Sequence, residues 1–331
     1  MKSLQFELWQ ECNSLCKFCY LGKENRVTPR EIKLKTLHDV YDKICDMSVY
    51  KEYDNLSYIG GEFFQGQLSD PEVKEVFMKI MIKTAELLKT GIIKSVWLMC
   101  TLTIGDQKDL YEVLDLYKDI TWNPSNSDGL WVITSYDTIG RFHNKKMHEN
   151  WKYHMLNIQH KYPHFKFNVT TILTQDLITK FLNDEFSFTD FMKTYKTSMF
   201  FKQPAPGAYS DLAIGNYLKS KQLLEADLPG FFPKRETFLK FLNKFCNTNP
   251  DMFDKLFNIK YRADDLYRNF NNLERHMEHN HRFKESKMET NVASDMATND
   301  CGHLMQYAAY IDSNKCMICD RDHIFNSINS D

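Results

Sequence analysis

Short apolar runs alternate with longer amphipathic segments along the first two-thirds of the chain. The short runs are rich in β-branched and aromatic residues, which is typical of strands. Six strands are therefore predicted, at residues 4–9, 56–59, 95–102, 130–135, 165–173 and 198–202.

The longer segments between these strands have the spacing of amphipathic helices. The first is the clearest, because Thr28, Pro29 and Glu31 form the pattern of a capping box with proline at the first helical position. Apolar residues then recur at helical spacing as far as Ile44. Further helices are predicted at residues 71–89, 106–119, 144–161 and 176–195.

Repeated alternation of strand and helix predicts an α/β fold with a parallel sheet and right-handed crossovers. Six units fit a partial (β/α)6 TIM-like barrel better than a closed eight-stranded one. In such barrels the chemistry takes place at the carboxyl ends of the strands. This core is expected to span residues 1–205.

The strand pattern stops after about residue 206. Residues 206–295 are predicted to form a helical segment, with helices near 238–245 and 261–281, and then a polar linker from residue 284. Residues 296–331 form a C-terminal extension that contains three cysteines and a strand-like run at 306–312.

The amino-acid composition limits the kinds of partner that are expected for this chain. The chain has 331 residues, 26% charged residues and a net charge of −2, so charge alone indicates neither a nucleic acid nor an anionic membrane as a partner. No apolar stretch approaches the roughly 20 residues that span a bilayer. The N-terminus also lacks the apolar core of a secretory leader, so a cytoplasmic location is expected.

Nine cysteines in a reducing compartment argue against a disulfide framework. Six of them form two tight groups near the ends of the chain, and clustered cysteines in such a compartment usually bind metal. Cys45 and Cys100 lie outside these groups and are expected to be small buried residues of the core.

The first group, Cys12, Cys16 and Cys19, follows directly on the first predicted strand with the spacing C-x3-C-x2-C. Three thiolates from one short loop can hold three irons of a [4Fe–4S] cluster and leave the fourth iron open to another ligand. A zinc site with a remote fourth ligand is the alternative, although zinc motifs more often use two pairs of ligands.

This loop, including the aromatic Phe18 before the last cysteine, resembles the hallmark motif of the radical SAM superfamily. The resemblance implies that S-adenosylmethionine (SAM) chelates the open iron through its amino and carboxylate groups. One electron from the reduced cluster then cleaves SAM to methionine and a 5′-deoxyadenosyl radical, which abstracts hydrogen from a substrate. It also implies a one-electron donor such as flavodoxin or ferredoxin.

Gly60, Gly61 and Glu62 end the second predicted strand, about 40 residues after the cysteine loop. The glycines allow a sharp turn and a close approach of the backbone to a ligand. The segment resembles the GGE motif of the same superfamily, which implies that it binds the SAM amino group.

Polar residues near the ends of later strands are further candidates for SAM contacts, by the same resemblance. Ser135 and Asp137 end the fourth strand, and Arg141 is close enough in sequence to reach the SAM carboxylate. Asn168 on the fifth strand is a candidate for the adenosine, and Gln203 ends the sixth. The alternative is ordinary solvation of strand ends.

The second cysteine group, Cys301, Cys316 and Cys319, has the spacing C-x14-C-x2-C. It is similar to the SPASM and twitch extensions of radical SAM enzymes, which implies one auxiliary [4Fe–4S] cluster. Cys246, His303 and His323 are the candidates for a fourth protein ligand, and the site can also lack one. A zinc knuckle or reduced structural thiols are the alternatives.

The sequence therefore predicts a radical SAM enzyme. The SPASM-like extension favours a peptide or protein side chain as the substrate, by analogy with peptide-modifying members of the superfamily. A small molecule such as a nucleotide, cofactor or sugar is the alternative substrate class. A non-catalytic iron–sulfur binding module is a rival from another class, but it would not need Gly60, Gly61 and Glu62.

Overall fold

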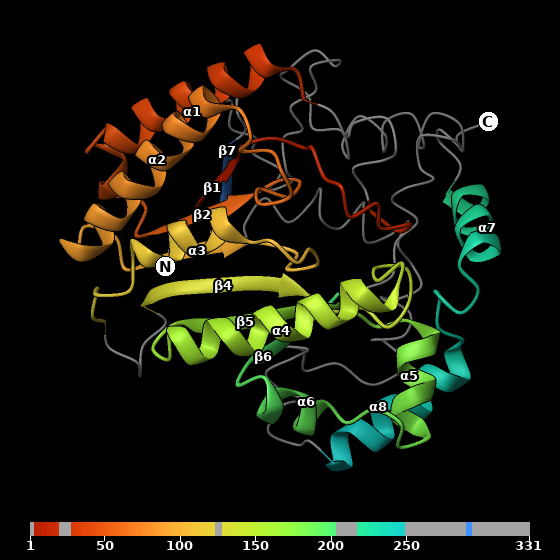
Figure 1. The fold of residues 1–331 in the computed structure, drawn as a ribbon. Coiled ribbons are helices and arrows are strands. Elements are labelled where there is room, and N and C mark those ends of the chain that lie inside the picture. Colours follow the sequence, from red (N-terminus) through yellow and green to blue (C-terminus); the bar gives the residue numbers. More distant parts are fainter. Residues whose placement is uncertain (1–2, 20–27, 123–127, 203–216, 249–288, 293–331) are drawn as a thin grey trace.

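The computed structural model describes residues 3–19, 28–122, 128–202, 217–248 and 289–292. They form an open sheet in which every strand pair is parallel, in the order β6-β5-β4-β3-β2-β1-β7 (Figure 1). The strands are β1 (Ser3–Glu7), β2 (Asn55–Ile59), β3 (Ser95–Met99), β4 (Gly129–Ser135), β5 (Lys166–Ile172), β6 (Ser198–Lys202) and β7 (Glu289–Val292).

Each of the first six strands is followed by at least one helix, so the predicted α/β partial barrel is confirmed. No helix in the described part of the chain is both long and apolar enough to cross a membrane. The helices are α1 (Arg30–Cys45), the 3-10 turn η1 (Val49–Lys51), α2 (Pro71–Lys89), α3 (Lys108–Asp115), α4 (Lys145–Lys161), α5 (Gln175–Leu182), α6 (Phe188–Thr194), α7 (Tyr217–Asp227) and α8 (Arg235–Thr248).

The capping box predicted at Thr28 does not form. Helix α1 begins one residue later, with Pro29 as its N-cap and no side-chain cap hydrogen bond. Arg30 instead forms ion pairs with Asp70, at 2.6 Å, and with Glu72 at the start of α2. The beginning of α1 is thus tied to the neighbouring helix rather than to its own first turn.

The single helix predicted over residues 176–195 is in fact two helices. Asp184 takes a positive φ of 61°, which ends α5. Ser187 then caps α6 by accepting a hydrogen bond from the backbone N–H of Asp190 at 3.2 Å. Apolar periodicity continues across this break, because both helices bury their apolar faces in the same core, so the sequence pattern hid the interruption.

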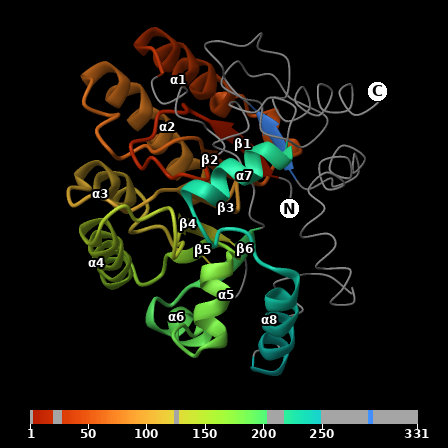
Figure 2. The same cartoon turned by 90° about the vertical axis from the view of Figure 1, so that its right-hand side faces the viewer.

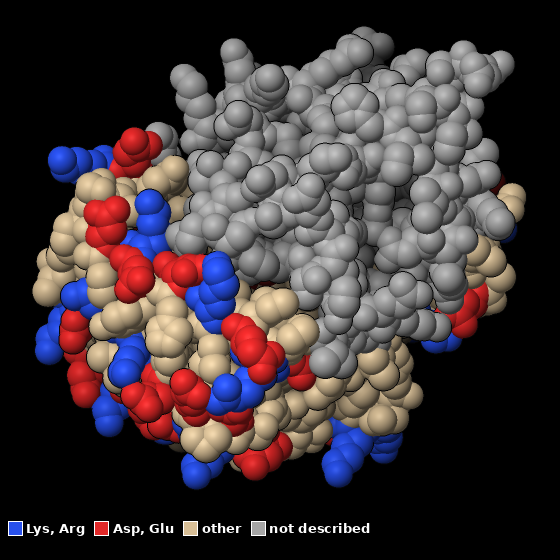
Figure 3. All heavy atoms as spheres, turned by 90° about the horizontal axis from the view of Figure 1, so that it is seen from above, with Lys and Arg blue, Asp and Glu red and all other residues tan. Residues whose placement is uncertain are grey.

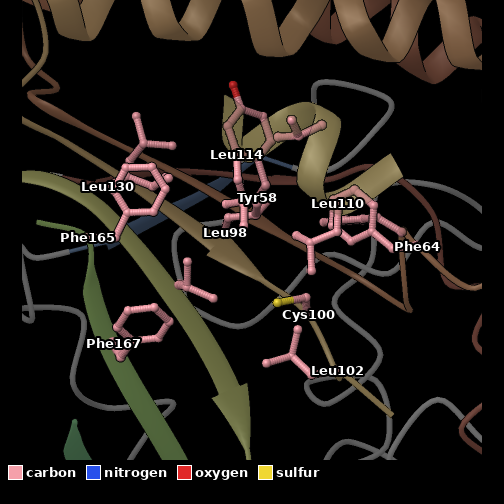
Figure 4. Close-up of a cluster of buried hydrophobic side chains, with 14 of the residues drawn as sticks. Tyr58, Phe64, Leu98, Cys100, Leu102, Leu110, Leu114, Leu130, Phe165 and Phe167 are labelled. Carbon is pink, nitrogen blue, oxygen red and sulfur yellow. The ribbon is translucent and has the colours of Figure 1, made fainter. Parts of the chain in front are cut away.

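The sheet has one apolar face and one face on which polar side chains lie among apolar ones. The apolar face packs against the helices, and Figure 4 shows Tyr58, Leu98, Leu130 and Phe167 from four neighbouring strands within this core. The Tyr58 hydroxyl is hydrogen-bonded to Thr84 on α2. Figure 2 looks towards the carboxyl ends of the strands and shows α1, α2, α3 and α4 arrayed around this side.

On the opposite face, a buried chain of hydrogen bonds crosses the amino ends of three strands. The Asn55 amide donates to the Ser3 hydroxyl at 2.7 Å and accepts from the Ser95 hydroxyl at 2.8 Å. We call this side the inner face. Because side chains alternate along a strand, Gln5, Glu7 and Ser57 lie on it as well.

Strand β7 lies in the segment that the sequence predicts to be a linker, so that expectation is wrong at residues 289–292. It pairs in parallel with β1, with Ser3 opposite Glu289 and Phe6 opposite Val292. An unpaired edge strand offers backbone hydrogen-bonding groups whatever its side chains are, so a polar segment can pair with it. The predicted helix at 238–245 is confirmed within α8, and the one at 261–281 lies outside the described residues.

Two surface features complete the fold. Lys and Arg alternate with Asp and Glu over the described part of the face in Figure 3, so no single-sign patch forms there. Cys100 is buried as predicted, but Cys45, the last residue of α1, is exposed, so its expected burial is wrong. The buried face of α1 is formed by other residues of the helix, such as Val40 and Ile44.

Candidate iron–sulfur and cofactor site

The three N-terminal cysteines lie in a loop at the carboxyl edge of the sheet, directly after β1. They form no disulfide, and Cys16 is buried whereas Cys12 and Cys19 are partly exposed. Within the loop, the backbone N–H of Cys19 donates to the carbonyl of Cys16 at 3.1 Å. Leu15 takes a positive φ of 50°, a backbone conformation that L-residues rarely adopt.

The segment Gly60–Glu62 runs alongside the residues that lead into this loop. The N–H of Gly61 donates to the Trp9 carbonyl at 2.7 Å, and the N–H of Glu62 donates to the Glu11 carbonyl at 2.8 Å. These bonds extend the pairing of β1 and β2 beyond the strand ends. The two motifs that the sequence places about 40 residues apart are therefore directly bonded.

Both glycines are required by this contact. A Cβ at Gly60, where φ is 138°, would lie 2.2 Å from the Trp9 carbonyl oxygen. A Cβ at Gly61 would lie 2.0 Å from the Glu11 carbonyl oxygen. The close approach that the glycines permit is thus to the backbone preceding Cys12, whereas the sequence analysis expected a close approach to a ligand.

The Glu62 carboxylate is fully buried and is held by backbone donors. One oxygen accepts from the N–H groups of Phe63, at 2.9 Å, and Phe64, at 3.1 Å, and the other accepts from Thr101 at 2.5 Å. Burial raises the pKa of Glu62, and these hydrogen bonds partly offset the rise. A carboxylate has about four acceptor positions, so the group retains capacity for a further donor.

Gln65 fastens the cysteine loop to the sheet, and the sequence analysis missed it. Its side-chain carbonyl accepts from the Asn13 N–H at 3.0 Å, and its backbone carbonyl accepts from the Asn13 side chain at 2.9 Å. Its amide donates to Ser14 at 2.8 Å and reaches the hydroxyls of Thr101 and Thr103. The one sequence feature that could have identified Gln65 as a site residue is its position three residues after Glu62.

A second set of contacts holds the other side of the loop. The guanidinium of Arg141 lies 5.4 Å from the ring centre of Phe18 and forms a 2.6 Å ion pair with Asp137. Asp137 in turn accepts a 2.7 Å hydrogen bond from the N–H of Ile172 at the end of β5. The structure therefore brings Phe18, Asp137 and Arg141 together, as three of the predicted site residues.

Arg141 is a positively charged side chain that interacts with the thiols of Cys16 and Cys19. Burial alone lowers the pKa of its guanidinium, but the charges of Cys16, Asp137 and Cys19 outweigh burial and raise it. Because the Arg141 guanidinium interacts with Cys16 and Cys19, it stabilises negative charge on these two thiols. Burial conversely raises the pKa of Cys12, with Ser14 partly offsetting it and Glu62 adding to it.

Helix α7 and the turn after it cover the cysteine loop. Cys16 and Phe18 pack against Leu224, Leu228 and Phe231, and the rings of Phe18 and Phe231 stack at 5.3 Å. Gly140 has a positive φ of 83°, which a side chain would strain, and a Cβ there would lie 2.6 Å from a Leu228 methyl group, so glycine suits this contact. The sequence predicts residues 206–295 to be a helical segment separate from the core that contains this loop, and this contact was not expected.

Loop 136–144 adds two direct contacts with the cysteine loop. The Lys17 N–H donates to the Gly140 carbonyl at 3.3 Å. His143 donates from its Nε2 atom to the Ser14 carbonyl at 2.6 Å. His143 is a second residue at this site that the sequence analysis did not identify.

Other candidates are less closely tied to the loop. Ser135 is the last residue of β4 and is partly exposed. Asn168 lies on β5 opposite Ile133, is 7% exposed, and has a side-chain oxygen with no hydrogen-bond partner in the described structure. The remaining predicted ligands lie outside the described residues or have undescribed side chains: Gln203, Cys246, Cys301, His303, Cys316, Cys319 and His323.

The donor set fits an iron–sulfur cluster in its chemistry. Three thiols that form no disulfide lie in one loop beside the largely buried guanidinium of Arg141. Among the described residues, no group of three or more His, Cys, Asp and Glu side chains is close enough together to hold a single metal ion. The structure thus gives the loop and the residues that support it.

Comparison with known proteins does not assign this chain to a family. No protein-family model matches the chain, and no curated protein matches it. Among solved structures, one described as native anSMEcpe with bound AdoMet and a Kp18Cys peptide aligns over 98% of this chain and 82% of its own, with a TM-score of 0.45 and 16% identity. The functional reading therefore depends on the residues themselves.

Proposed function

We propose that this protein is a radical SAM enzyme, which cleaves SAM reductively and uses the resulting 5′-deoxyadenosyl radical to abstract hydrogen from a substrate. The observation that supports this most strongly is the direct bonding of the two motifs. The C-x3-C-x2-C loop and the Gly60–Glu62 segment share backbone hydrogen bonds at the carboxyl edge of a parallel α/β sheet. That edge is where such folds place their chemistry.

Cys12, Cys16 and Cys19 would hold a [4Fe–4S] cluster, which supplies the electron for SAM cleavage. The protein would receive that electron from a donor such as flavodoxin or ferredoxin. Phe18 and the apolar residues of α7 exclude water from one side of the loop. Arg141 supplies positive charge beside the thiolates, which favours the more negative, reduced state.

Glu62 would orient the SAM amino group through its remaining acceptor capacity, with Gly60 and Gly61 holding its backbone against residues 9–11. Ser135, Asp137, Arg141 and Asn168 stay predictions as SAM contacts. Since Asp137 already binds Arg141 and the Ile172 N–H, its part would be to position Arg141. The proposed substrate is a peptide or protein side chain, with Cys301, Cys316 and Cys319 holding an auxiliary [4Fe–4S] cluster.

Replacement of Cys16 with alanine tests the cluster assignment. With dithionite as the reductant, the wild-type protein reconstituted without oxygen should form 5′-deoxyadenosine from SAM, and Cys16→Ala should fall to background. Cys45→Ala is the matched control, because Cys45 is an exposed thiol at the end of α1 and should leave the rate unchanged. Retained cleavage in Cys16→Ala would contradict the assignment.

Iron analysis of the same preparations tests the second cluster. Two [4Fe–4S] clusters require about eight irons per chain and one cluster about four. Replacement of Cys316 should lower the wild-type value by half. About four irons together with one zinc per wild-type chain would replace the auxiliary cluster with a structural zinc site.

A further inference from the structure

The inner face of the sheet contains buried polar groups that nothing in the described structure satisfies. Both carboxylate oxygens of Glu7, the hydroxyl of Ser57, the indole N–H of Trp97 and the side-chain oxygen of Asn168 are buried without a hydrogen-bond partner there. Such groups are uncommon in folded proteins, because each one loses its hydrogen bonds to water. Several on one face indicate a polar occupant.

The strand register places Glu7, Ser57 and Trp97 on three neighbouring strands, whereas Asn168 on β5 lies four strands away from β1. Ser57 on β2 is directly opposite Trp97 on β3, and Glu7 on β1 is opposite Ile59, two residues further along β2. Paired strands are about 4.8 Å apart and residues two apart in a strand are about 6.6 Å apart. Glu7 and Ser57 are therefore diagonal neighbours at the edge of the sheet that leads to Cys12.

Glu7 is the ionisable residue in this set of unsatisfied groups on the inner face, and it is almost completely buried. Its side chain is 1% exposed, and burial raises its pKa to about 8. The nearby Gln10 amide offsets this partly, although neither its Nε2 nor the Glu7 oxygens make a hydrogen bond of good geometry among the described residues. A buried carboxyl group must bind either a proton or a cation, since an isolated buried charge is very unfavourable.

The cations of the surrounding elements are engaged elsewhere. Lys33 on α1 pairs with Glu11 and lies over Trp9. Lys166 on β5 lies 5.4 Å from the ring centre of Trp131. Its strand is four strands away from β1, and across the sheet Lys166 is aligned with the position two residues before Glu7. Arg141 is paired with Asp137 beside the cysteine loop. The described protein thus supplies Glu7 with no counter-ion.

We propose that Glu7 anchors the substrate on the inner face, and that the substrate carries an ammonium or guanidinium group that forms an ion pair with the Glu7 carboxylate. This rests on the proposed function, because the site is defined by its position next to the cysteine loop. Ser57 and Trp97 would bind neighbouring polar groups of the same molecule. Side chains of lysine and arginine in a peptide have this chemistry.

Direct binding tests the proposal without depending on turnover. The probes are N-acetyl-lysine and N-acetyl-arginine methylamides, with the uncharged norleucine and citrulline analogues as matched isosteres. n-Propylguanidine and n-butylamine provide the same cations without peptide groups. Affinities are measured by isothermal titration on the reconstituted full chain with SAM present, for wild type, Glu7→Gln, Glu7→Asp and the control Glu31→Gln, which removes an exposed carboxylate from α1.

The wild type and Glu31→Gln should bind the cationic probes at least tenfold more tightly than the uncharged isosteres. Glu7→Gln should lose this preference, and Glu7→Asp, which keeps the charge, should retain part of it. Peptide-like probes that bind better than n-propylguanidine and n-butylamine would identify a peptide as the source of the cation, and the reverse order would identify a small amine or guanidine.

Three results would overturn the proposal. These are no binding of any cationic probe to the wild type, equal binding of charged and uncharged probes, and loss of affinity for SAM itself in Glu7→Gln, which would place Glu7 in the SAM site. Failure of the proposed function is seen separately, as absence of SAM cleavage by the wild type. Thermal unfolding of each variant identifies any loss of folding.

Discussion

At the residue scale, Arg141 connects two functions of the site. Its guanidinium lies over the ring face of Phe18 and interacts with Cys16 and Cys19. Asp137, just after β4, fixes the position of the guanidinium through an ion pair. The sequence analysis assigned Arg141 to the SAM carboxylate. Its surroundings support a second role, because a fixed, largely buried cation beside thiolates stabilises added negative charge.

Removal of this charge should make the cluster harder to reduce. Arg141→Gln is expected to shift the midpoint potential of the N-terminal cluster to more negative values by about 60 mV, equivalent to about 1.4 kcal/mol for a one-electron couple. Redox titration followed by electron paramagnetic resonance measures this shift. Arg141→Lys keeps the charge and should shift the potential much less. Equal potentials in wild type and Arg141→Gln would show that Arg141 does not tune the cluster.

At the element scale, the site is a pair of loops that extend the pairing of β1 and β2. The Gly60–Glu62 segment bonds to residues 9–11, and Gln65 fastens Asn13 and Ser14. The cysteine loop therefore cannot move independently of the β2 loop. This coupling explains why glycine is needed at two successive positions.

Gly61→Ala should disrupt both loops. Its Cβ would lie 2.0 Å from a backbone oxygen that cannot move without breaking the strand extension, so we expect a loss of at least about 3 kcal/mol in the free energy of unfolding. Denaturant unfolding measures this, and iron content should fall as well. Gly105→Ala is the control, because its Cβ would meet nothing closer than 3.7 Å and should change stability by less than about 0.5 kcal/mol. Similar stabilities for the two variants would refute the steric explanation.

At the scale of the whole molecule, segments distant in the sequence complete the N-terminal part of the site. Helix α7 covers the cysteine loop, and β7 pairs with β1, the strand that leads into it. Without β7, β1 would be an edge strand among the described elements. The C-terminal half of the chain thus protects the strand that leads to Cys12.

Truncation can separate the contribution of β7 from that of the C-terminal extension. A chain ending at residue 296 keeps β7, whereas one ending at residue 284 loses it. Hydrogen–deuterium exchange should show β1 protected in the longer chain and exchanging faster in the shorter one, because β1 then has hydrogen-bonding groups open to water. Equal protection of β1 in both chains would show that the pairing contributes nothing to its stability.

Several features of this protein followed from local sequence alone. Alternating strand and helix patterns gave six strands of the parallel sheet, because each pattern reflects the burial of one side of one element. The spacing of Cys12, Cys16 and Cys19 identified the candidate site, because three ligands in one loop need no tertiary information. Phe18 and the Gly60–Glu62 segment were found in the same way, as short motifs at strand ends.

Other features depended on which distant segments meet. The positions of Gln65 and His143, the cover that α7 provides, and the pairing of β7 with β1 come from contacts across tens to hundreds of residues. The start of α1 and the break between α5 and α6 were also settled by neighbours, through Arg30 and the shared core. Local sequence determined the elements and the motif, because those depend on short-range spacing. Only the tertiary structure decided what surrounds the motif, because burial, charge and packing at a site depend on every segment that reaches it.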